Sequence, residues 1–314
     1  MKPAVSATVR TASPAARIRR TLSLYGWLYV FILPGVVLLF LFAYVPMLGV
    51  QIAFKDFVIY KGMWSSPWVG LKYFYFLGDP VFWQSFVNTI AITGLRFVFG
   101  FPAPIILALM LNEVRSDPFK RAVQSFSYLP HFISWIVVSY ILYTFLQMDT
   151  GPMNMLLKSL GAEQVSFMGI PAYFRPIVII SAIWKEIGWG TIIYLAALSG
   201  IDPQLYEAAM IDGAGRFRRI FSINVPGIMP TISILLILSL PGLTTAGYEQ
   251  IYPLVNPTNL GVSNVLDVYL IRLGLTQAQY SVATAIGLAL AVLNISIVLG
   301  SNWAAKRLGQ TGFW

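Results

Sequence analysis

The first long apolar run of the chain decides its class of fold. Residues Tyr25 to Phe54 read YGWLYVFILPGVVLLFLFAYVPMLGVQIAF and include no charged side chain. A helix rises 1.5 Å per residue, so roughly twenty apolar residues cross a hydrocarbon layer about 30 Å thick. Because this run exceeds that length, it predicts a membrane-spanning helix with room to tilt.

Five further apolar runs follow, separated by more polar connections. The six expected spans are Tyr25 to Phe54, Phe82 to Leu111, Ala122 to Gln147, Pro176 to Leu198, Ile228 to Gly247 and Tyr280 to Trp303. Of the 314 residues, 57% are hydrophobic and 11% are charged, and the mean hydropathy is +0.73. Ordinary soluble domains carry about 25% charged residues. The composition therefore excludes a water-soluble globular enzyme and predicts an all-α polytopic membrane protein with six transmembrane helices.

The distribution of charge predicts the orientation. With both termini on one side, that side carries thirteen of the 21 lysines and arginines, and the opposite side carries six. The positive-inside rule then places both termini in the cytoplasm. This orientation accounts for most of the net charge of +9, so no nucleic-acid partner is required. We expect a basic arm without stable structure over residues 1–24, interacting with anionic lipid, a transmembrane domain over 25–303 and a cytoplasmic tail over 304–314.

The inner connection over residues 199–227 contains signals for the start and end of a helix. It begins SGIDPQLYEAAMIDGAGRFRRI. Asp202 is a good N-cap and Pro203 a good first helical residue, while Gly213 and Gly215 allow a sharp turn. The pattern predicts a short cytoplasmic helix, a bend, a basic segment and re-entry into the membrane at Pro226.

The same connection resembles the "EAA" loop of ATP-binding-cassette (ABC) importer permeases. Glu207-Ala208-Ala209 is followed after three residues by Gly213, and Ile223, Val225 and Pro226 complete the pattern. Val225 stands where the family usually has leucine. In that family the loop is a coupling helix seated in a cleft of the cytoplasmic ATPase, whereas outside it the segment would be an ordinary connecting helix. The resemblance implies that the ATPase contacts are made by Glu207, Ala208, Ala209, Asp212 and Gly213.

Other segments extend the resemblance over most of the chain. Ser85 to Thr89 and Ile211 to Ala214 are typical of the carbohydrate, maltose-type branch. Tyr44 to Met47 and Trp68 to Leu71 are similar to the subgroup that imports oligosaccharides of uronic acids such as alginate. The resemblance implies a permease of the cytoplasmic membrane that works by alternating access. Its implied partners are a second homologous permease, two cytoplasmic ATPase subunits, an extracytoplasmic solute-binding protein and the oligosaccharide. Permeases for other oligosaccharides or for peptides are alternatives, and so is an ion-driven secondary carrier.

No catalytic site is expected on this chain. A phosphate-binding loop ends in glycine, lysine and serine or threonine, and the nearest approach, Gly151 to Ser159, has Leu157 where glycine is needed. The chain has no cysteine and one histidine, His131, so metal chemistry has few ligands, and a Ser199–His131 nucleophile pair lacks its sequence signature. We expect a transport subunit without a cofactor of its own, with ATP and Mg²⁺ bound by the partner ATPase.

Three ionisable residues fall inside the expected spans. An isolated charge there costs at least about 2.5–3.5 kcal/mol, so Arg96, Lys185 and Glu186 should each have a partner. One hypothesis is a structural Arg96–Glu186 bridge with Lys185 bonded to carbonyls; Lys185 and Glu186 point about 100° apart and are not expected to pair. The other is that Arg96 or Lys185 lines a midplane cavity and binds sugar carboxylates. The expected substrate-pathway residues are Arg96, Tyr140, Tyr143, Trp184, Lys185, Glu186 and Asn294, and the alternative role for the aromatic and polar residues in the spans is helix packing.

Overall fold

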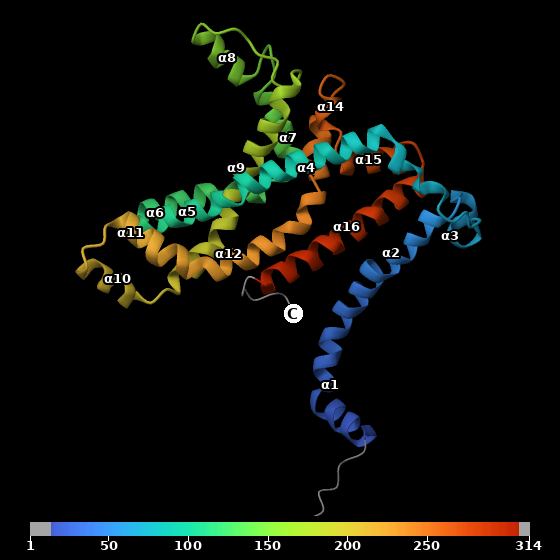
Figure 1. Ribbon diagram of the computed structural model, residues 1–314, viewed down its shortest axis with the longest axis horizontal. Coiled ribbons are helices and arrows are strands. Elements are labelled where there is room, and N and C mark those ends of the chain that lie inside the picture. Colours follow the sequence, from blue (N-terminus) through green and yellow to red (C-terminus); the bar gives the residue numbers. More distant parts are fainter. Residues whose placement is uncertain (1–13, 308–314) are drawn as a thin grey trace, which may run out of the picture.

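The computed structural model describes residues 14–307, which form helices joined by turns and loops (Figure 1). Within those residues the structure has no strand, and one isolated antiparallel bridge joins Lys55 and Trp68. The expected all-α class is confirmed. Residues 1–13 of the expected arm and 308–314 of the expected tail lie outside the described residues. The α-helices are α1 (Pro14–Leu39), α2 (Val45–Met47), α3 (Gly62–Ser65), α4 (Pro80–Gly100), α5 (Pro102–Glu113), α6 (Asp117–Tyr128), α7 (Trp135–Phe145), α8 (Pro152–Ser159), α9 (Pro171–Ser199), α10 (Pro203–Ile211), α11 (Arg216–Arg219), α12 (Val225–Ser239), α13 (Tyr248–Ile251), α14 (Leu260–Ser263), α15 (Leu266–Ile271) and α16 (Tyr280–Arg307).

Within residues 14–307, five helical segments are long and apolar enough to cross a membrane, and they correspond to the first, second, fourth, fifth and sixth expected spans. The first helix differs at its start. Helix α1 begins at Pro14, a residue suited to the first helical position, so residues 14–24 are helical. We expected no stable structure over these residues. The five segments are Ser23–Phe54, Pro80–Glu113, Pro171–Ser199, Arg216–Thr244 and Tyr280–Trp303.

The fifth span starts earlier than expected. Sequence reasoning placed its entry at Pro226, but helix begins at Arg216 and continues through a π-helical turn over Ile220–Asn224 into α12. A proline ring clashes with the carbonyl four residues before it in an ordinary α-helix, and a π-helical turn widens the backbone at that place. The basic segment is therefore the first turn of the span.

The third expected span, Ala122 to Gln147, is not one straight helix. Its two halves, Asp117–Phe132 and Trp135–Phe145, are bent by 102°. A 3-10 turn over Leu129–Phe132 leads into extended backbone, and Ser134 restarts the helix as N-cap, with its hydroxyl accepting a hydrogen bond from the Val137 amide at 3.4 Å. With 11 residues, α7 is about 16 Å long, too short to cross a bilayer alone. The pair is either one broken span or a re-entrant segment.

The helix α9 organises the bundle, because it contacts α4, α5, α6, α12 and α14. Small residues let the neighbours approach closely. A Cβ added to Gly188 would lie 2.1 Å from the backbone oxygen of Ser127 on α6, so only glycine fits at this contact. Helix α9 thus lies at the centre of the bundle, packed closely against α5, α4 and α6.

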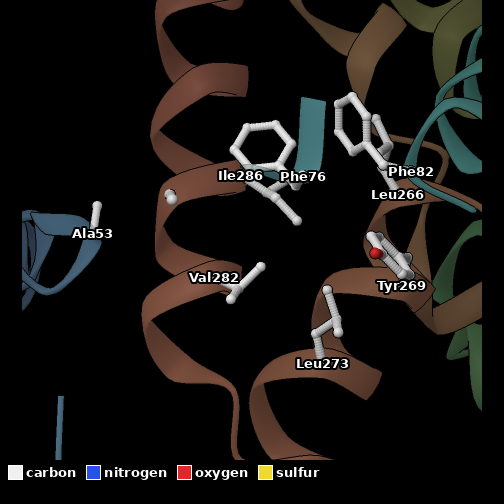
Figure 2. Packing of buried hydrophobic residues seen from close by; sticks show 9 residues of the cluster. Ala53, Phe76, Phe82, Leu266, Tyr269, Leu273, Val282 and Ile286 are labelled. Atoms are coloured by element: carbon white, nitrogen blue, oxygen red, sulfur yellow. The ribbon is translucent and has the colours of Figure 1, made fainter. Parts of the chain in front are cut away.

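A second core joins the end of the first span to the C-terminal helix (Figure 2). Ala53 faces α16 near Val282 and Ile286, and Phe82 and Tyr269 extend the cluster on the other side. N-terminal to this contact, α1 stands clear of the bundle (Figure 1), and in the most apolar window of the first span no residue is buried. Lipid or another subunit must therefore cover most of this helix.

Candidate translocation cavity and coupling segment

A cavity of about 490 Å³ lies between the second, fourth and fifth spans. Helices α4 and α5 form one wall, α9 forms the second, and the end of α12 with the 3-10 turn that follows it forms the third. Most of the lining side chains are apolar. The polar or aromatic side chains among them are Thr93, Arg96, Phe97, Phe101, Glu186, Trp189, Tyr194, Ser239 and Thr245.

Arg96 on α4 is held in this cavity by a neutral amide. Its Nη2 donates to Oε1 of Gln250 at 2.7 Å. Gln250, on α13, is 1% exposed, and its Nε2 donates to the Val178 carbonyl at 2.8 Å and to the Ser181 hydroxyl at 2.9 Å. All hydrogen-bonding groups of this amide are therefore in use. The Nε of Arg96 is buried and has no hydrogen-bond partner in the described part of the chain.

The loop that carries Gln250 depends on a glycine. Gly247 has φ of +89°, a left-handed conformation that favours glycine, and its amide donates to Oδ2 of Asp267 at 3.0 Å. This turn ends the fifth span and sends α13 back against α7 and α9, where the Ser139 hydroxyl donates to the Gln250 carbonyl at 3.0 Å. The turn thus places the amide opposite Arg96.

The expected Arg96–Glu186 bridge is not formed. Glu186 Oε2 lies 2.8 Å from His131 Nδ1, and its Oε1 lies 3.4 Å from Lys185 Nζ. The expectation that Lys185 and Glu186 would not pair is therefore wrong, because both side chains are long enough to meet beside His131. Lys185 Nζ also donates to the His131 carbonyl at 2.7 Å. These contacts attach α9 to the bend before α7, and the His131 ring stacks on Trp189 with centroids 4.4 Å apart.

The structure brings only part of the expected pathway together. Arg96 and Glu186 line the cavity, and Lys185 is buried beside it. Tyr140, Tyr143 and Trp184 are exposed and do not line it, and Asn294 accepts a hydrogen bond from Thr244 at 2.6 Å, between α16 and the end of the fifth span. Sequence reasoning missed Gln250, which sits in an outer connection and has no motif around it.

The segment after the fourth span is presented outward. Asp202 caps α10 by accepting from the Gln204 amide at 2.9 Å, and Gly213, with φ of +73°, turns the chain after the helix. No residue of α10 is buried, and Ile211 is 87% exposed. One hydrogen bond, from Tyr206 to Asn224 at 2.6 Å, ties the helix to the fifth span. This hydrogen bond therefore joins α10 to the first turns of that span.

The motif residues share this outward position. Glu207, Ala208, Asp212 and Gly213 are exposed and Ala209 is half-buried. Glu207 takes part in no salt bridge with another described residue. In Figure 1, α10 forms one tip of the molecule, away from α8.

The carboxylate of Asp56 forms polar contacts within the first outer connection, between the first and second spans. The Tyr73 hydroxyl donates to Asp56 at 2.5 Å, and Lys72 lies 3.6 Å from the same carboxylate. The tyrosine hydrogen bond, helped by Lys72, lowers the pKa of Asp56 below its ordinary 3.8. The same hydrogen bond raises the pKa of Tyr73 to about 12. The hydroxyl therefore remains a donor at physiological pH.

These features define a membrane transport subunit: apolar spans packed into a bundle, a cavity between them, and the exposed helix α10 just before the fifth span. Residues 100–310 match the family described as the inner membrane component of binding-protein-dependent transport systems, and the chain belongs to this family. It is a multi-pass permease subunit of an ABC importer of the inner membrane. Subunits of this kind are not catalytic, and ATP hydrolysis belongs to a separate ATPase subunit.

Similar proteins support this assignment over nearly the whole length of the chain. Protein LplB of Bacillus subtilis (strain 168) is 45% identical over 98% of this chain and 97% of the relative. The polygalacturonan/rhamnogalacturonan transport system permease protein YteP of the same organism is 42% identical over 99% and 98%. A chain in the crystal structure of a bacterial ABC transporter involved in the import of the acidic polysaccharide alginate is 41% identical, with a TM-score of 0.86 over 93% of this chain and 99% of that one.

Proposed function

We propose that this permease carries acidic, uronate-containing oligosaccharides, alginate oligomers among them, into the cytoplasm. The observation that carries the proposal is the charge of Arg96 in the cavity. Its partner Gln250 is neutral, whereas the charge of Glu186 is matched by Lys185. Asp267 and Glu186 lie near enough to act on its charge, but no salt bridge among the described residues ties Arg96 to either, so the guanidinium can bind a substrate carboxylate through two parallel hydrogen bonds. Two relatives above 40% identity are named for the transport of acidic polysaccharides, which agrees with this chemistry.

The proposed assembly contains a second homologous permease, two cytoplasmic ATPase subunits that bind ATP and Mg²⁺, and an extracytoplasmic solute-binding protein. In support, a transporter of related structure is described in complex with an alginate pentasaccharide-bound periplasmic protein. Both termini face the cytoplasm in this proposal, with residues 1–24 and 304–314 flanking the transmembrane domain over 25–303. The segment over 199–227 is the coupling loop.

Coupling is proposed to act through α10. When the ATPase dimer closes on ATP, its cleft moves α10, and the hydrogen bond between Tyr206 and Asn224 transmits that motion to the fifth span, one wall of the cavity. Two packed arrangements with different preference for the nucleotide are enough for alternating access. Glu207 is proposed to pair with a basic residue of the ATPase, and Ala208 and Ala209 keep the contact close.

Uptake into proteoliposomes tests the coupling. In the assembled complex, Glu207→Ala is expected to lower ATP-driven uptake at least tenfold while ATP hydrolysis persists. Gln204→Ala, on the same helix but outside the motif, is the matched control. Uptake that is unchanged by Glu207→Ala in a complex of normal composition removes the proposed role.

The substrate is tested with one oligomer in two forms. Arg96→Met is expected to weaken uptake of a uronate oligomer while leaving uptake of its carboxyl-reduced, neutral form unchanged. Equal losses for the two forms refute recognition by charge and favour a carrier of other oligosaccharides. Failure of the complex to assemble shows instead that Arg96 has a structural role.

A further inference from the structure

A second, larger concavity of about 740 Å³ lies at the end of the bundle where the second span finishes and the fifth span begins. Its walls come from two antiparallel segments, the last turns of α5 and the first turns of the helix that starts at Arg216. Figure 1 shows α5 and α11 at the same end of the molecule as α10. We call this concavity the α5–α11 groove. It is separate from the translocation cavity, with which it shares no lining residue.

The walls of the groove are two matching apolar stripes. On α5 the stripe consists of Ile106, Leu109 and Met110, and on the opposite segment of Phe217, Ile220 and Phe221. Residues three and four apart share one face of a helix, so each stripe faces the same way along about one turn. Ile106, Met110, Phe217 and Phe221 are each more than half exposed, so nothing in the described chain covers these walls.

The mouth of the groove is positively charged. Arg115 and Arg216 line it, and within the described residues neither forms a salt bridge. The one carboxylate in the lining, Glu113, is matched by Arg219 at 3.8 Å. Two guanidinium groups from segments about one hundred residues apart therefore meet at the same opening with their charge uncompensated.

Charge and apolar surface are arranged in order of depth. The second span runs toward this end and finishes at Glu113, beyond its apolar stripe and two residues before Arg115, while the fifth span starts at Arg216 and runs away from this end through its own stripe. The cations therefore lie at the level of the lipid headgroups, and the stripes lie within the hydrocarbon. A ligand that fits has a negative head and an apolar chain directed into the membrane.

We propose that the α5–α11 groove binds an anionic glycerophospholipid of the cytoplasmic leaflet, with its phosphate at Arg115 and Arg216 and an acyl chain between the two stripes. A cation near an anionic lipid surface contributes about a fivefold gain in binding, so the two arginines together correspond to about thirtyfold. Because Arg216 begins the span that also carries the Asn224 contact of α10, a bound lipid stabilises the end of the coupling path.

The test uses the assembled transporter in nanodiscs and a phosphatidylglycerol with a diazirine on its acyl chain. After irradiation, labels are expected on peptides containing residues 106–115 and 216–221, at least fivefold above those from a phosphatidylcholine probe with the same chains. Equal labelling by both probes, or labels confined to other spans, overturns the proposal. Absence of labels on these peptides, with labels on the second permease instead, overturns it as well.

Variants then separate the groove from general attraction to anionic lipid. Arg115→Gln with Arg216→Gln is expected to lower retained phosphatidylglycerol at least fivefold, and lysine at both positions is expected to restore it. The matched control is Arg121→Gln with Arg218→Gln, which removes the same charge from exposed positions outside the lining. Equal losses in the two double variants overturn a specific site. If the glutamine pair does not assemble, the labelling pattern of the unaltered transporter decides.

Discussion

Replacing Gln250 by glutamate changes one heavy atom in the amide that holds Arg96. The new carboxylate keeps the 2.7 Å hydrogen bond from Nη2 and adds a charge that neutralises the guanidinium. The two donations from Nε2 are lost, each worth about 1 kcal/mol, and the new oxygen faces the Val178 carbonyl oxygen, a cost that the charged bond to Arg96 offsets only in part. We therefore expect a less stable complex, so its assembly is checked before uptake is measured, and a changed electrostatic field in the cavity.

The size of the effect follows from the geometry. A sugar carboxylate on the far edge of the guanidinium would lie about 7 Å from the new carboxylate, since each is about 2.8 Å from a guanidinium nitrogen. At an effective dielectric constant of about 20, two like charges at this distance repel by about 2 kcal/mol. Because 1.36 kcal/mol corresponds to a factor of ten, the half-saturating concentration of a uronate oligomer should rise about thirtyfold.

The assay is concentration-dependent uptake by proteoliposomes that contain ATP. The carboxyl-reduced oligomer supplies the internal comparison, because the variant should leave its half-saturating concentration unchanged. Gln279→Glu is the matched control, since Gln279 lines a different concavity, near Asp56. If Gln250→Glu shifts the acidic and the neutral oligomer equally in a fully assembled complex, recognition of the substrate by Arg96 is refuted.

Three further perturbations have defined outcomes. Gly213→Val forces a β-branched residue into φ of +73° and should lower ATP-driven uptake severalfold, whereas Gly213→Asn should retain it, because asparagine tolerates left-handed backbone. Gly188→Ala places a Cβ 2.1 Å from the Ser127 oxygen and should destabilise the complex by about 1–3 kcal/mol in a thermal unfolding assay, while Gly94→Ala, with open space around it, should not. Because the pKa of Asp56 is lowered in the folded state, its stabilising contribution is present at neutral pH and is lost as the pH falls through the folded-state pKa. Hydrogen exchange across the first outer connection, corrected for its intrinsic rate, should therefore rise only below about pH 4. Asp56→Asn should remove this pH dependence.

Hydropathy was sufficient to predict the spans because burial in lipid depends on composition more than on neighbours. It failed at the third span, where apolar residues continue through Ile133 while the backbone turns by 102°. The bend depends on Pro130, on the Ser134 cap and on the contact of His131 with Glu186. Of these, only the contact with Glu186 involves another helix, and no local sequence pattern predicts it.

The helix α10 was predictable because its signals are local, whereas the start of the fifth span at Arg216 was not. Asp202 and Pro203 start the helix, and Gly213 ends it, as the residue types indicated. The cavity was predictable only as a requirement that Arg96 have a partner. That Gln250 meets this requirement depends on the left-handed turn at Gly247, which tertiary packing places.

The separation of Arg96 from Gln250 by 154 residues bears on how the subunit is made. At about 5–20 residues per second, synthesis of the intervening chain takes about 8–30 seconds. Throughout that interval the second span holds a guanidinium that has lost water and has not yet met its amide, at a cost of at least about 2.5–3.5 kcal/mol in lipid. The nascent subunit therefore depends on the insertion machinery, or on water beside the helix, to solvate the Arg96 guanidinium until the fifth span and the turn after it have been synthesised.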